Sequence, residues 1–156
     1  MTEGELKKEL YTQAGLVRED IYDDPRGFKI IKRNGIEKIQ AHYGVVVSYD
    51  LKEEIIWQGD RVMQFIKVKA TGKLGNRTIE TYGEASPMNC VNKYPIATAE
   101  KRALSRAVLK LTGLYKYGYF GQDEILDEKD ENKLVKNLKN VLPKTNVQRN
   151  MGNKKA

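Results

Sequence analysis

The sequence predicts an α+β domain in which a three-stranded antiparallel sheet, built around a β-hairpin, packs on a long alanine-rich helix. Residues 61–71 and 77–83 flank a Gly-containing turn, and polar and apolar side chains alternate along both, as in a hairpin. After Pro95, apolar residues recur at steps of three and four up to Gly113, which is the pattern of an amphipathic helix. A basic, flexible C-terminal tail completes this prediction.

Five elements are expected before the hairpin. Glu3–Val17 carries apolar residues at helical spacing, and Phe28–Ile31 favours a brief strand. Gly35–Tyr43 is predicted as a helix because Gly44 follows it as a C-terminal stop. Val45–Tyr49 is rich in β-branched and aromatic residues, so we predict a strand there and a separate short strand over Glu54–Gln58.

The segments after the hairpin are predicted from the residues that interrupt or begin regular structure. Gly83–Tyr94 holds Gly, Ser, Pro and Asn and indicates a loop. Pro95 suits the first turn of a helix, which then extends to Thr112. A last helix is expected over Asp130–Leu142, before Pro143, and the polar Lys144–Ala156 is predicted to be disordered.

The chain therefore divides into an N-terminal helix and linker over 1–27, a core domain over 28–127, and a short helix with its tail over 128–156. With 156 residues, one hydrophobic core is the natural expectation. The single cysteine permits no internal disulfide, and we expect no zinc site and no cofactor. No apolar run approaches the length of a membrane span, so a soluble, cytoplasmic protein without membrane contact is predicted.

The formal charge of +7 is unevenly distributed. Residues 128–156 carry eight Lys or Arg against three Asp or Glu, which leaves a net charge of only +2 on residues 1–127. Within that part the bases gather in 61–82 and 93–117. This distribution predicts an electropositive face that would select a polyanion.

Two sets of side chains are candidates for phosphate contacts. The helix after Pro95 places Arg102, Arg106 and Lys110 in register at i, i+4 and i+8, with Lys101 on the same polar arc. The polar side of the hairpin is expected to present Lys67, Lys69 and Arg77, and also Arg61, which would make one sheet face basic. Several aromatic residues close in sequence to these basic side chains could stack on unpaired nucleobases, namely Tyr82, Tyr94, Tyr115, Tyr117, Tyr119 and Phe120.

Catalytic residues are not predicted. His42 and Cys90 are the only residues of their kinds, and neither lies in a nucleophile motif, so we expect no enzyme activity. The acids Asp50, Glu53, Glu54 and Asp60 could bind Mg²⁺, but they are expected in hairpin turns, where acidic residues are common. The turn Gly72–Gly75 lacks the ending of a phosphate loop.

A longer pattern is recognisable in residues 28–121. Tyr82-Gly83-Glu84-Ala85-Ser86-Pro87, the run Ile96-Ala97-Thr98-Ala99-Glu100-Lys101-Arg102-Ala103-Leu104-Ser105-Arg106-Ala107 and the downstream Gly113-Leu114-Tyr115 resemble phage single-strand annealing proteins of the Rad, Sak and Erf kind. The resemblance implies a β-β-β-α core that assembles into rings or filaments and holds single-stranded DNA in a basic groove between sheet and helix. It also implies that Lys101, Arg102 and Arg106 contact phosphates, with Lys67, Lys69 and Arg77 as groove candidates by location.

We therefore expect a single-stranded DNA-binding protein that promotes strand annealing in phage homologous recombination or repair. A homo-oligomer is expected because one short domain contacts few nucleotides, and the basic tail could recruit recombination or replication proteins or gather DNA. Two alternatives are a Mg²⁺-dependent nuclease and an RNA-binding or scaffold module.

Overall fold

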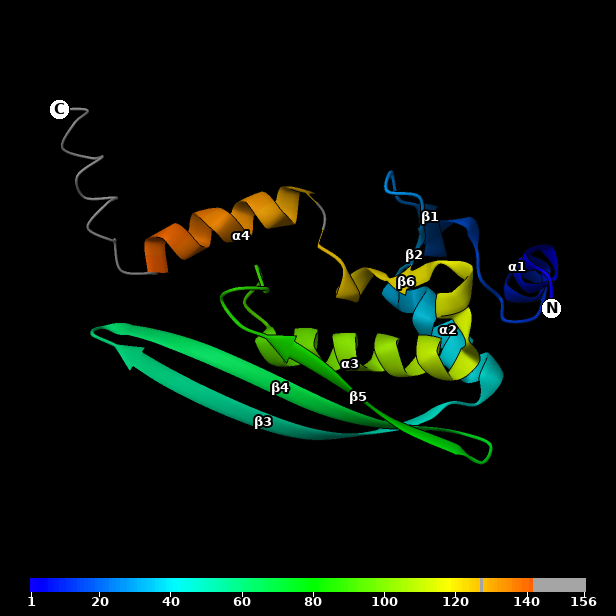
Figure 1. Ribbon diagram of the computed structural model, residues 1–156, viewed down its shortest axis with the longest axis horizontal. Helices are drawn as coiled ribbons and strands as arrows, with labels where there is room; N and C mark the ends of the chain where they lie inside the picture. The colour runs from blue at the N-terminus through cyan, green and yellow to red at the C-terminus, as the bar shows by residue number, and fades with distance from the viewer. Residues whose placement is uncertain (127, 142–156) are drawn as a thin grey trace.

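The computed structural model describes residues 1–126 and 128–141 and has an α+β fold, as predicted. A twisted three-stranded sheet forms one layer, and the long helix α3 (Pro95–Thr112) lies along it as the next (Figure 1). On the other side of α3 lie α2 (Arg33–Tyr43), a second small sheet and α4 (Glu128–Val141). The helix is thus covered from two sides.

The larger sheet contains β3 (Val46–Gln58), β4 (Arg61–Leu74) and β5 (Arg77–Ala85), in this spatial order. Both pairs are antiparallel, so the predicted three-stranded antiparallel sheet is confirmed. The two strands expected over residues 45–49 and 54–58 are one continuous strand, because the charged residues between them stay paired with β4. The β3–β4 hairpin extends beyond the N-terminal end of α3 (Figure 1).

The contact between α3 and the sheet is unusually close at Gly83. A Cβ atom at this position would lie 1.9 Å from the carbonyl oxygen of Ala99 and 2.6 Å from the nitrogen of Ala103. The helix backbone therefore rests directly on β5, and small residues are needed on both sides. Beyond its last turn, Gly113 adopts a φ of 74° and ends the helix.

A second small sheet joins distant parts of the chain, and of its strands the sequence predicted the brief one at Phe28–Ile31, which is confirmed as β2, but not the other two. It contains β1 (Ile21–Asp23), β2 (Lys29–Ile31) and β6 (Tyr119–Gly121). β2 pairs antiparallel with β1 and parallel with β6. These strands have three residues each, which is too short for a periodic pattern to show in the sequence.

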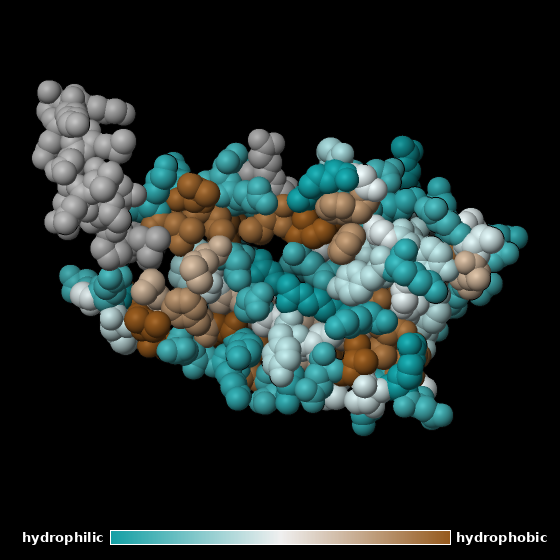
Figure 2. Space-filling model, in the orientation of Figure 1, coloured by the Kyte–Doolittle hydropathy of each residue, from teal (hydrophilic) through white to brown (hydrophobic). Residues whose placement is uncertain are grey.

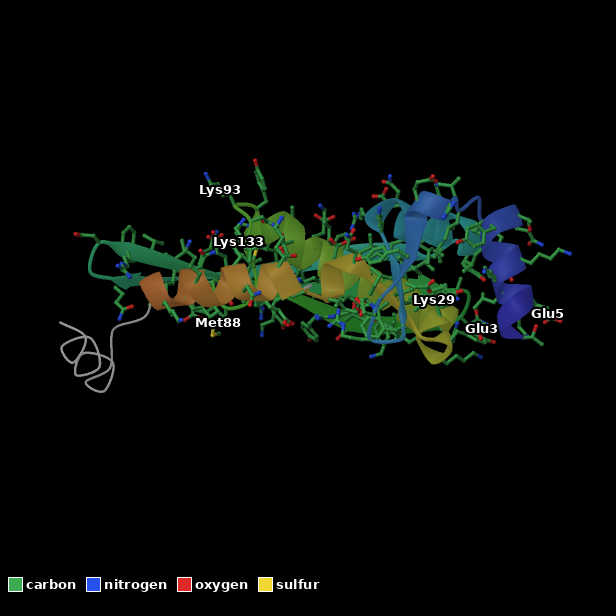
Figure 3. The ribbon with its side chains drawn as sticks, turned by 90° about the horizontal axis from the view of Figure 1, so that it is seen from above. Glu3, Glu5, Lys29, Met88, Lys93 and Lys133 are labelled. Carbon is green, nitrogen blue, oxygen red and sulfur yellow. The ribbon has the colours of Figure 1, made fainter. Side chains whose placement is uncertain are left out.

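The main core lies between α3 and the N-terminal elements. Buried side chains from α1 (Glu3–Thr12), α2 and α3 meet there, among them Leu10, Ile36, Ile39, Leu109 and Leu111. Polar contacts fix the helices at the rim of this core. His42 Nε2 lies 3.0 Å from Glu9 Oε1. Lys29 Nζ lies 3.9 Å from Glu3 Oε1, and Figure 3 labels Lys29 and Glu3 at the α1 end of the molecule.

Short 3₁₀ segments connect the elements, at Arg18–Asp20, Leu114–Tyr117 and Gln122–Glu124. The last predicted helix corresponds to α4, which begins two residues earlier than expected and ends at Val141. The predicted disordered tail lies outside the described residues. None of the helices in the described part of the chain is long and apolar enough to cross a membrane.

Candidate nucleic-acid interface

The register of the sheet sorts its charged residues onto two faces. Ile66, Val68 and Ala70 of β4 are buried under α3, so the residues between them point to the opposite, outer face. Lys67 and Lys69 therefore lie on the outer face, as expected. Arg77 pairs with Leu74 and lies on the helix side, so the prediction that Arg77 shares a face with Lys67 and Lys69 is wrong.

The outer face is not uniformly basic, contrary to the prediction. Its lysines alternate with acids across the strands, because the register brings Asp50 opposite Lys69 and Glu84 opposite Lys67. Lys69 Nζ also lies 3.9 Å from Glu80 Oε1. By strand parity the face carries five basic and four acidic residues, namely Lys52, Arg61, Lys67, Lys69, Lys73, Asp50, Glu54, Glu80 and Glu84.

One part of this face concentrates lysines around an aromatic ring. A shallow hollow of about 110 Å³ is lined by Tyr82, Lys52, Lys67, Lys69 and Asp50. Tyr82 is 47% exposed, and Lys67 Nζ lies 6.0 Å from the centre of its ring. Lys52 and Lys67 are direct neighbours on adjacent strands, an arrangement of like charges that is unfavourable without an anion. The hollow combines a stacking surface with cations.

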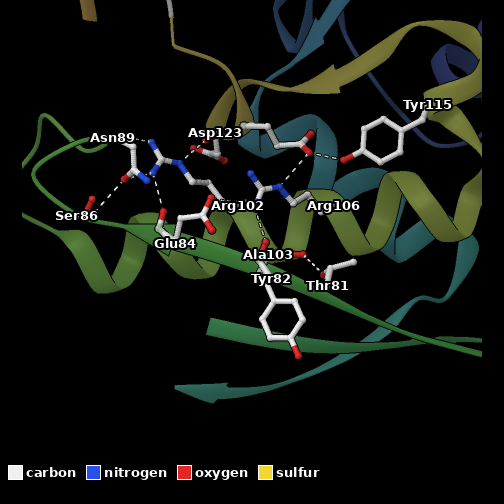
Figure 4. A network of polar contacts seen from close by, with 11 residues as sticks. Thr81, Tyr82, Glu84, Ser86, Asn89, Arg102, Ala103, Arg106, Tyr115 and Asp123 are labelled. Atoms are coloured by element: carbon white, nitrogen blue, oxygen red, sulfur yellow. Dashed lines mark hydrogen bonds and ion pairs between the residues drawn. The ribbon is translucent and has the colours of Figure 1, made fainter. Parts of the chain in front are cut away.

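Arg102 is not on a solvent-facing arc, which corrects the prediction for this residue. Its side chain is buried, and the residue is only 7% exposed. The guanidinium donates to the carbonyl oxygens of Glu84 at 2.7 Å, Asn89 at 2.5 Å and Asp123 at 2.8 Å, and to Asn89 Oδ1 at 3.0 Å (Figure 4). Every acceptor belongs to the protein, so Arg102 joins β5, the loop after it and the segment after β6.

Arg106 is also engaged within the protein. It donates to the carbonyl oxygen of Tyr82 and lies 3.6 Å from Glu124 Oε1 and 3.9 Å from Glu84 Oε1 (Figure 4). Its side chain is 31% exposed. Arg106 is therefore a partly exposed cation whose charge is already matched by two carboxylates, and the prediction of a free phosphate contact does not fit this geometry.

The spacing of these arginines matches the strand that they cover. Four residues of helix advance about 6 Å, and two residues of strand advance about 6.8 Å. Arg102 and Arg106 can therefore reach Glu84 and Tyr82, whose carbonyls point to the same edge of β5. Arg77 makes the reverse contact by donating to the Leu111 carbonyl at the end of α3. The row of bases is part of the joint between helix and sheet.

The groove expected between sheet and helix is closed where α3 lies on β5. The helix backbone contacts Gly83, and the Thr81 hydroxyl donates to the Ala103 carbonyl at 2.8 Å across the same seam. Ala99, Ala103 and Ala107 are fully buried there. A polynucleotide cannot enter this seam between α3 and β5. A hollow of about 460 Å³ lies at the N-terminal end of α3, between Gln64 of β4 and residues 93–97 and Glu100.

The remaining helix candidates do not join the outer-face lysines. Lys101 follows the sheet-facing Ala99 by two residues, which turns it about 200° around α3, away from the sheet. Its charge faces Asp123 instead. Lys110 is exposed in the last turn of α3. Lys101 and the pair Lys67 and Lys69 thus lie on opposite sides of the sheet layer.

Tyr115 is not available for stacking, although the sequence suggested it. Its ring packs against Phe120 at 5.6 Å between centroids and contacts the main core. Its hydroxyl donates to Glu124 Oε1, and burial raises the pKa of this phenol. Burial also raises the pKa of Glu124 above its ordinary value. Tyr115 and Glu124 therefore form a buried polar pair beside Arg106.

The carboxylates considered for Mg²⁺ do not converge. Asp50, Glu53 and Glu54 lie along β3 rather than in turns, and Glu53 points to the other face from Asp50 and Glu54. Asp60 lies in the tight turn after β3. Within residues 1–126 and 128–141, no three His, Cys, Asp or Glu side chains are grouped so as to hold a metal ion.

The sequence alone gave one usable signal for the hollow, which is the alternation of Lys67, Lys69 and Tyr82 across the hairpin. Lys52 was missed because residues 50–53 were expected to turn rather than to continue the strand. Comparison with known proteins adds no relative: no family model matches this chain, and no curated protein matches its sequence.

Proposed function

We propose that this protein binds single-stranded DNA without strong sequence preference and promotes annealing of complementary strands, in phage homologous recombination or repair. The observation that carries the proposal is the outer-face hollow, where Tyr82 is half exposed among Lys52, Lys67 and Lys69. Single-strand binders combine this kind of aromatic surface with cations that contact the backbone. The resemblance to phage annealing proteins supports the same function.

The chemistry needed for annealing is binding without base readout. Lysines at the hollow neutralise phosphates, and one base stacks on Tyr82 while its neighbours remain exposed. Two strands held in this way approach each other with less charge repulsion, and their exposed bases can pair. The scheme requires no cofactor and no bond cleavage, so the protein acts as a binding protein and not as an enzyme.

Other bases contribute outside the hollow. Lys101 and Lys110 are proposed to add weak phosphate contacts along the strand, because Lys110 is exposed and Lys101 partly so. Arg102, Arg106 and Arg77 are assigned to the fold. The basic tail is proposed to gather DNA or to bind recombination or replication proteins.

A homo-oligomer, as a ring or a filament, is part of the proposal. One hollow of about 110 Å³ holds no more than one nucleotide base, which gives little affinity by itself. Repeating the hollow along an oligomer multiplies the contacts with one strand.

The stacking role is tested with Tyr82→Ala and the matched control Tyr94→Ala. Tyr94 is 73% exposed and lies outside the hollow. Fluorescence anisotropy with a labelled single strand should show a 5- to 150-fold loss of affinity, or about 1–3 kcal/mol, for Tyr82→Ala alone. Equal affinity of both variants and the parent protein would remove the basis of the proposal.

The lysines are tested through salt dependence. The double variant Lys67→Ala with Lys69→Ala should reduce the slope of log affinity against log salt by about 1.4, because each single-strand phosphate contact contributes about 0.7. The control Lys7→Ala with Lys8→Ala changes two exposed lysines on α1 and should leave the slope unchanged. A similar reduction in both double variants would indicate only a general charge effect.

A strand-annealing assay then separates the possible activities. Complementary labelled oligonucleotides should anneal faster with the parent protein than with Tyr82→Ala. Cleavage of either strand with Mg²⁺ or Mn²⁺ would favour the nuclease alternative. Preference for RNA over DNA in competition would favour the RNA-binding alternative.

A further inference from the structure

The β3 edge of the larger sheet differs from the rest of the surface in its exposed apolar side chains. In the described part of the chain, β4 is the one strand that pairs with β3, so the other edge of β3 has no strand partner. Along it, Trp57 is 71% exposed, Ile55 51%, Leu51 43% and Tyr49 42%. Apolar residues at the distal end of this hairpin are also visible on the surface in Figure 2. A long apolar edge without proline readily pairs with another strand.

The four residues share one face. They have odd numbers and alternate with the outer-face residues of β3, so they lie on the helix side. There α3 covers β4 and β5, where Ile66, Val68 and Ala85 are buried, but it leaves the same side of β3 half exposed. Continuing the sheet past β3 would cover these side chains.

We infer that β3 pairs with β3 of a second copy of this chain, antiparallel and about a twofold axis at Glu53. In this register the numbers of opposite residues sum to 106, and the helix side brings Tyr49 opposite Trp57 and Leu51 opposite Ile55, each twice. On the outer face Lys52 lies opposite Glu54, also twice. Opposite-charge and apolar cross-strand pairs stabilise a sheet.

Neighbouring registers fit less well. Opposite residues of the two strands share a face of the sheet only if the sum of their numbers is even. The alternative registers nearest to 106 therefore have sums of 104 and 108. A sum of 104 places Lys52 opposite itself and Asp50 opposite Glu54, which pairs like charges. A sum of 108 places Glu53 opposite Ile55 and leaves Tyr49 without a β3 partner. Among these three registers, charge and apolar pairing agree at 106 alone.

The contact at the axis is tolerable because Glu53 is drawn away from it. Glu53 Oε1 accepts a hydrogen bond from Gln64 Nε2 of β4 at 2.8 Å. The carboxylate therefore leans toward its own sheet rather than toward the second copy. The paired sheet has six strands and two Tyr82 hollows on one face. This twofold pair is the unit from which further contacts on single-stranded DNA would build the proposed ring or filament.

The pairing rests on the proposed function in one respect: it names the contact that joins two chains into the twofold unit of the proposed oligomer. Its test contains no DNA, so failure of this contact and failure of DNA binding are distinguishable. The variant Glu53→Cys is made in a Cys90→Ser background, because Cys90 is a free thiol. Opposite residues in an antiparallel pair lie about 4.5–5.5 Å apart at Cα, which suits a disulfide.

Under glutathione buffer, Glu53→Cys should give a disulfide-linked dimer on a non-reducing gel. The control Ser48→Cys is also exposed on β3, but it would lie ten residues, or about 34 Å, from its own copy and should remain unlinked. Absence of the linked dimer in Glu53→Cys, or equal linkage in both variants, overturns the register.

Light scattering tests the pair without new thiols. The parent protein should have twice the 17.8 kDa mass of the chain at high concentration, and Ile55→Lys should have the mass of one chain with an unchanged circular dichroism spectrum. The control Val46→Lys changes a side chain that has no partner in this register and should keep the doubled mass. The inference is overturned if the parent protein has the mass of one chain, in which case the β3 edge would be available to a peptide of another protein. It is also overturned if Ile55→Lys keeps the doubled mass.

Discussion

The two edges of the larger sheet are treated in opposite ways. At β5, Arg102 and Arg106 reach over from α3 and hydrogen-bond the carbonyls of Glu84 and Tyr82. At β3, apolar side chains remain exposed along a strand of 13 residues. One edge is closed by the fold, and the other is open to a partner.

The difference shows what a row of bases on a helix can mean. A basic row at i, i+4 and i+8 favours a polyanion site if the helix has one free side. Here the helix has layers on two sides, and the edge of a sheet supplies acceptors at nearly the same spacing. A guanidinium satisfied by carbonyls has few donors left for phosphate.

The closeness of α3 to β5 gives the largest expected effect. Gly83→Ala should lower the free energy of unfolding by about 4 kcal/mol or prevent folding, because its Cβ would overlap the helix backbone. The control Gly4→Ala adds a Cβ whose nearest neighbour, apart from adjacent residues and helix backbone, is 4.0 Å away and should cost little. Urea unfolding followed by circular dichroism measures both. A Gly83→Ala protein as stable as Gly4→Ala would contradict the sealed seam.

The closed edge is tested next through Arg102. Arg102→Ala should cost about 3 kcal/mol of stability, because a buried guanidinium is removed and four part-buried acceptors lose a charged donor. Lys101→Ala, the adjacent and more exposed base, should cost less than about 0.5 kcal/mol. Chemical denaturation compares the two. If Arg102→Ala kept full stability and lost only DNA affinity, Arg102 would be a phosphate contact after all.

A smaller effect is expected at Arg106. Arg106→Ala removes one hydrogen bond to Tyr82 and two longer ion pairs, which together are worth about 1 kcal/mol at a partly exposed site. Its binding of single-stranded DNA should fall by less than that of Tyr82→Ala. Anisotropy and unfolding measured on the same preparation separate the loss of DNA affinity from the loss of stability. If Arg106→Ala lost more DNA affinity than Tyr82→Ala, the binding site would lie on α3 instead.

The smallest effect concerns pH. Burial raises the pKa of Glu124, although Tyr115 and the Gly121 amide donate to its carboxylate. The folded protein therefore keeps this proton to a higher pH than the unfolded chain. The resulting stabilisation is complete below the unfolded value of 4.5 and is lost as pH rises through the folded pKa.

Glu124→Gln removes this titration while it keeps an oxygen acceptor. The stability of the parent protein relative to Glu124→Gln should therefore be higher at pH 4 than at pH 7, in thermal unfolding across this range. If the stability of the two proteins changed with pH in the same way, protonation of Glu124 would not contribute to the stability of the fold.

Local pattern predicted much of the fold. The β4–β5 hairpin and the stop at Gly113 follow from residues close in sequence, and the structure has both. The joining of residues 46–58 into one strand could not be predicted, because Asp50, Lys52 and Glu53 resemble a turn until β4 pairs with them. The small sheet was missed for the same reason, since β2 and β6 are joined across almost ninety residues.

The candidate site divides in the same way. Alternation along β4 already placed Lys67 and Lys69 on one face, but it put Arg77 with them, and only the register of β5 shows that Tyr82 lies there instead. The burial of Arg102 and Tyr115 was not predictable from spacing, although one signal was present. Leu104, Val108 and Leu109 add a second apolar arc to the alanine stripe, which is typical of a helix covered on two sides.

The sequence by itself determined the β4–β5 hairpin, the helices α2 and α3 and the side of β4 on which Lys67 and Lys69 lie, because periodicity and turn residues act between near neighbours. The tertiary structure alone decided which cations are available and which sheet edge is covered. A cation is available only if no carbonyl or carboxylate from a distant segment pairs with it, and the carbonyls of Glu84, Asn89 and Asp123 all accept hydrogen bonds from Arg102. In the described part of the chain, no strand pairs with the free edge of β3.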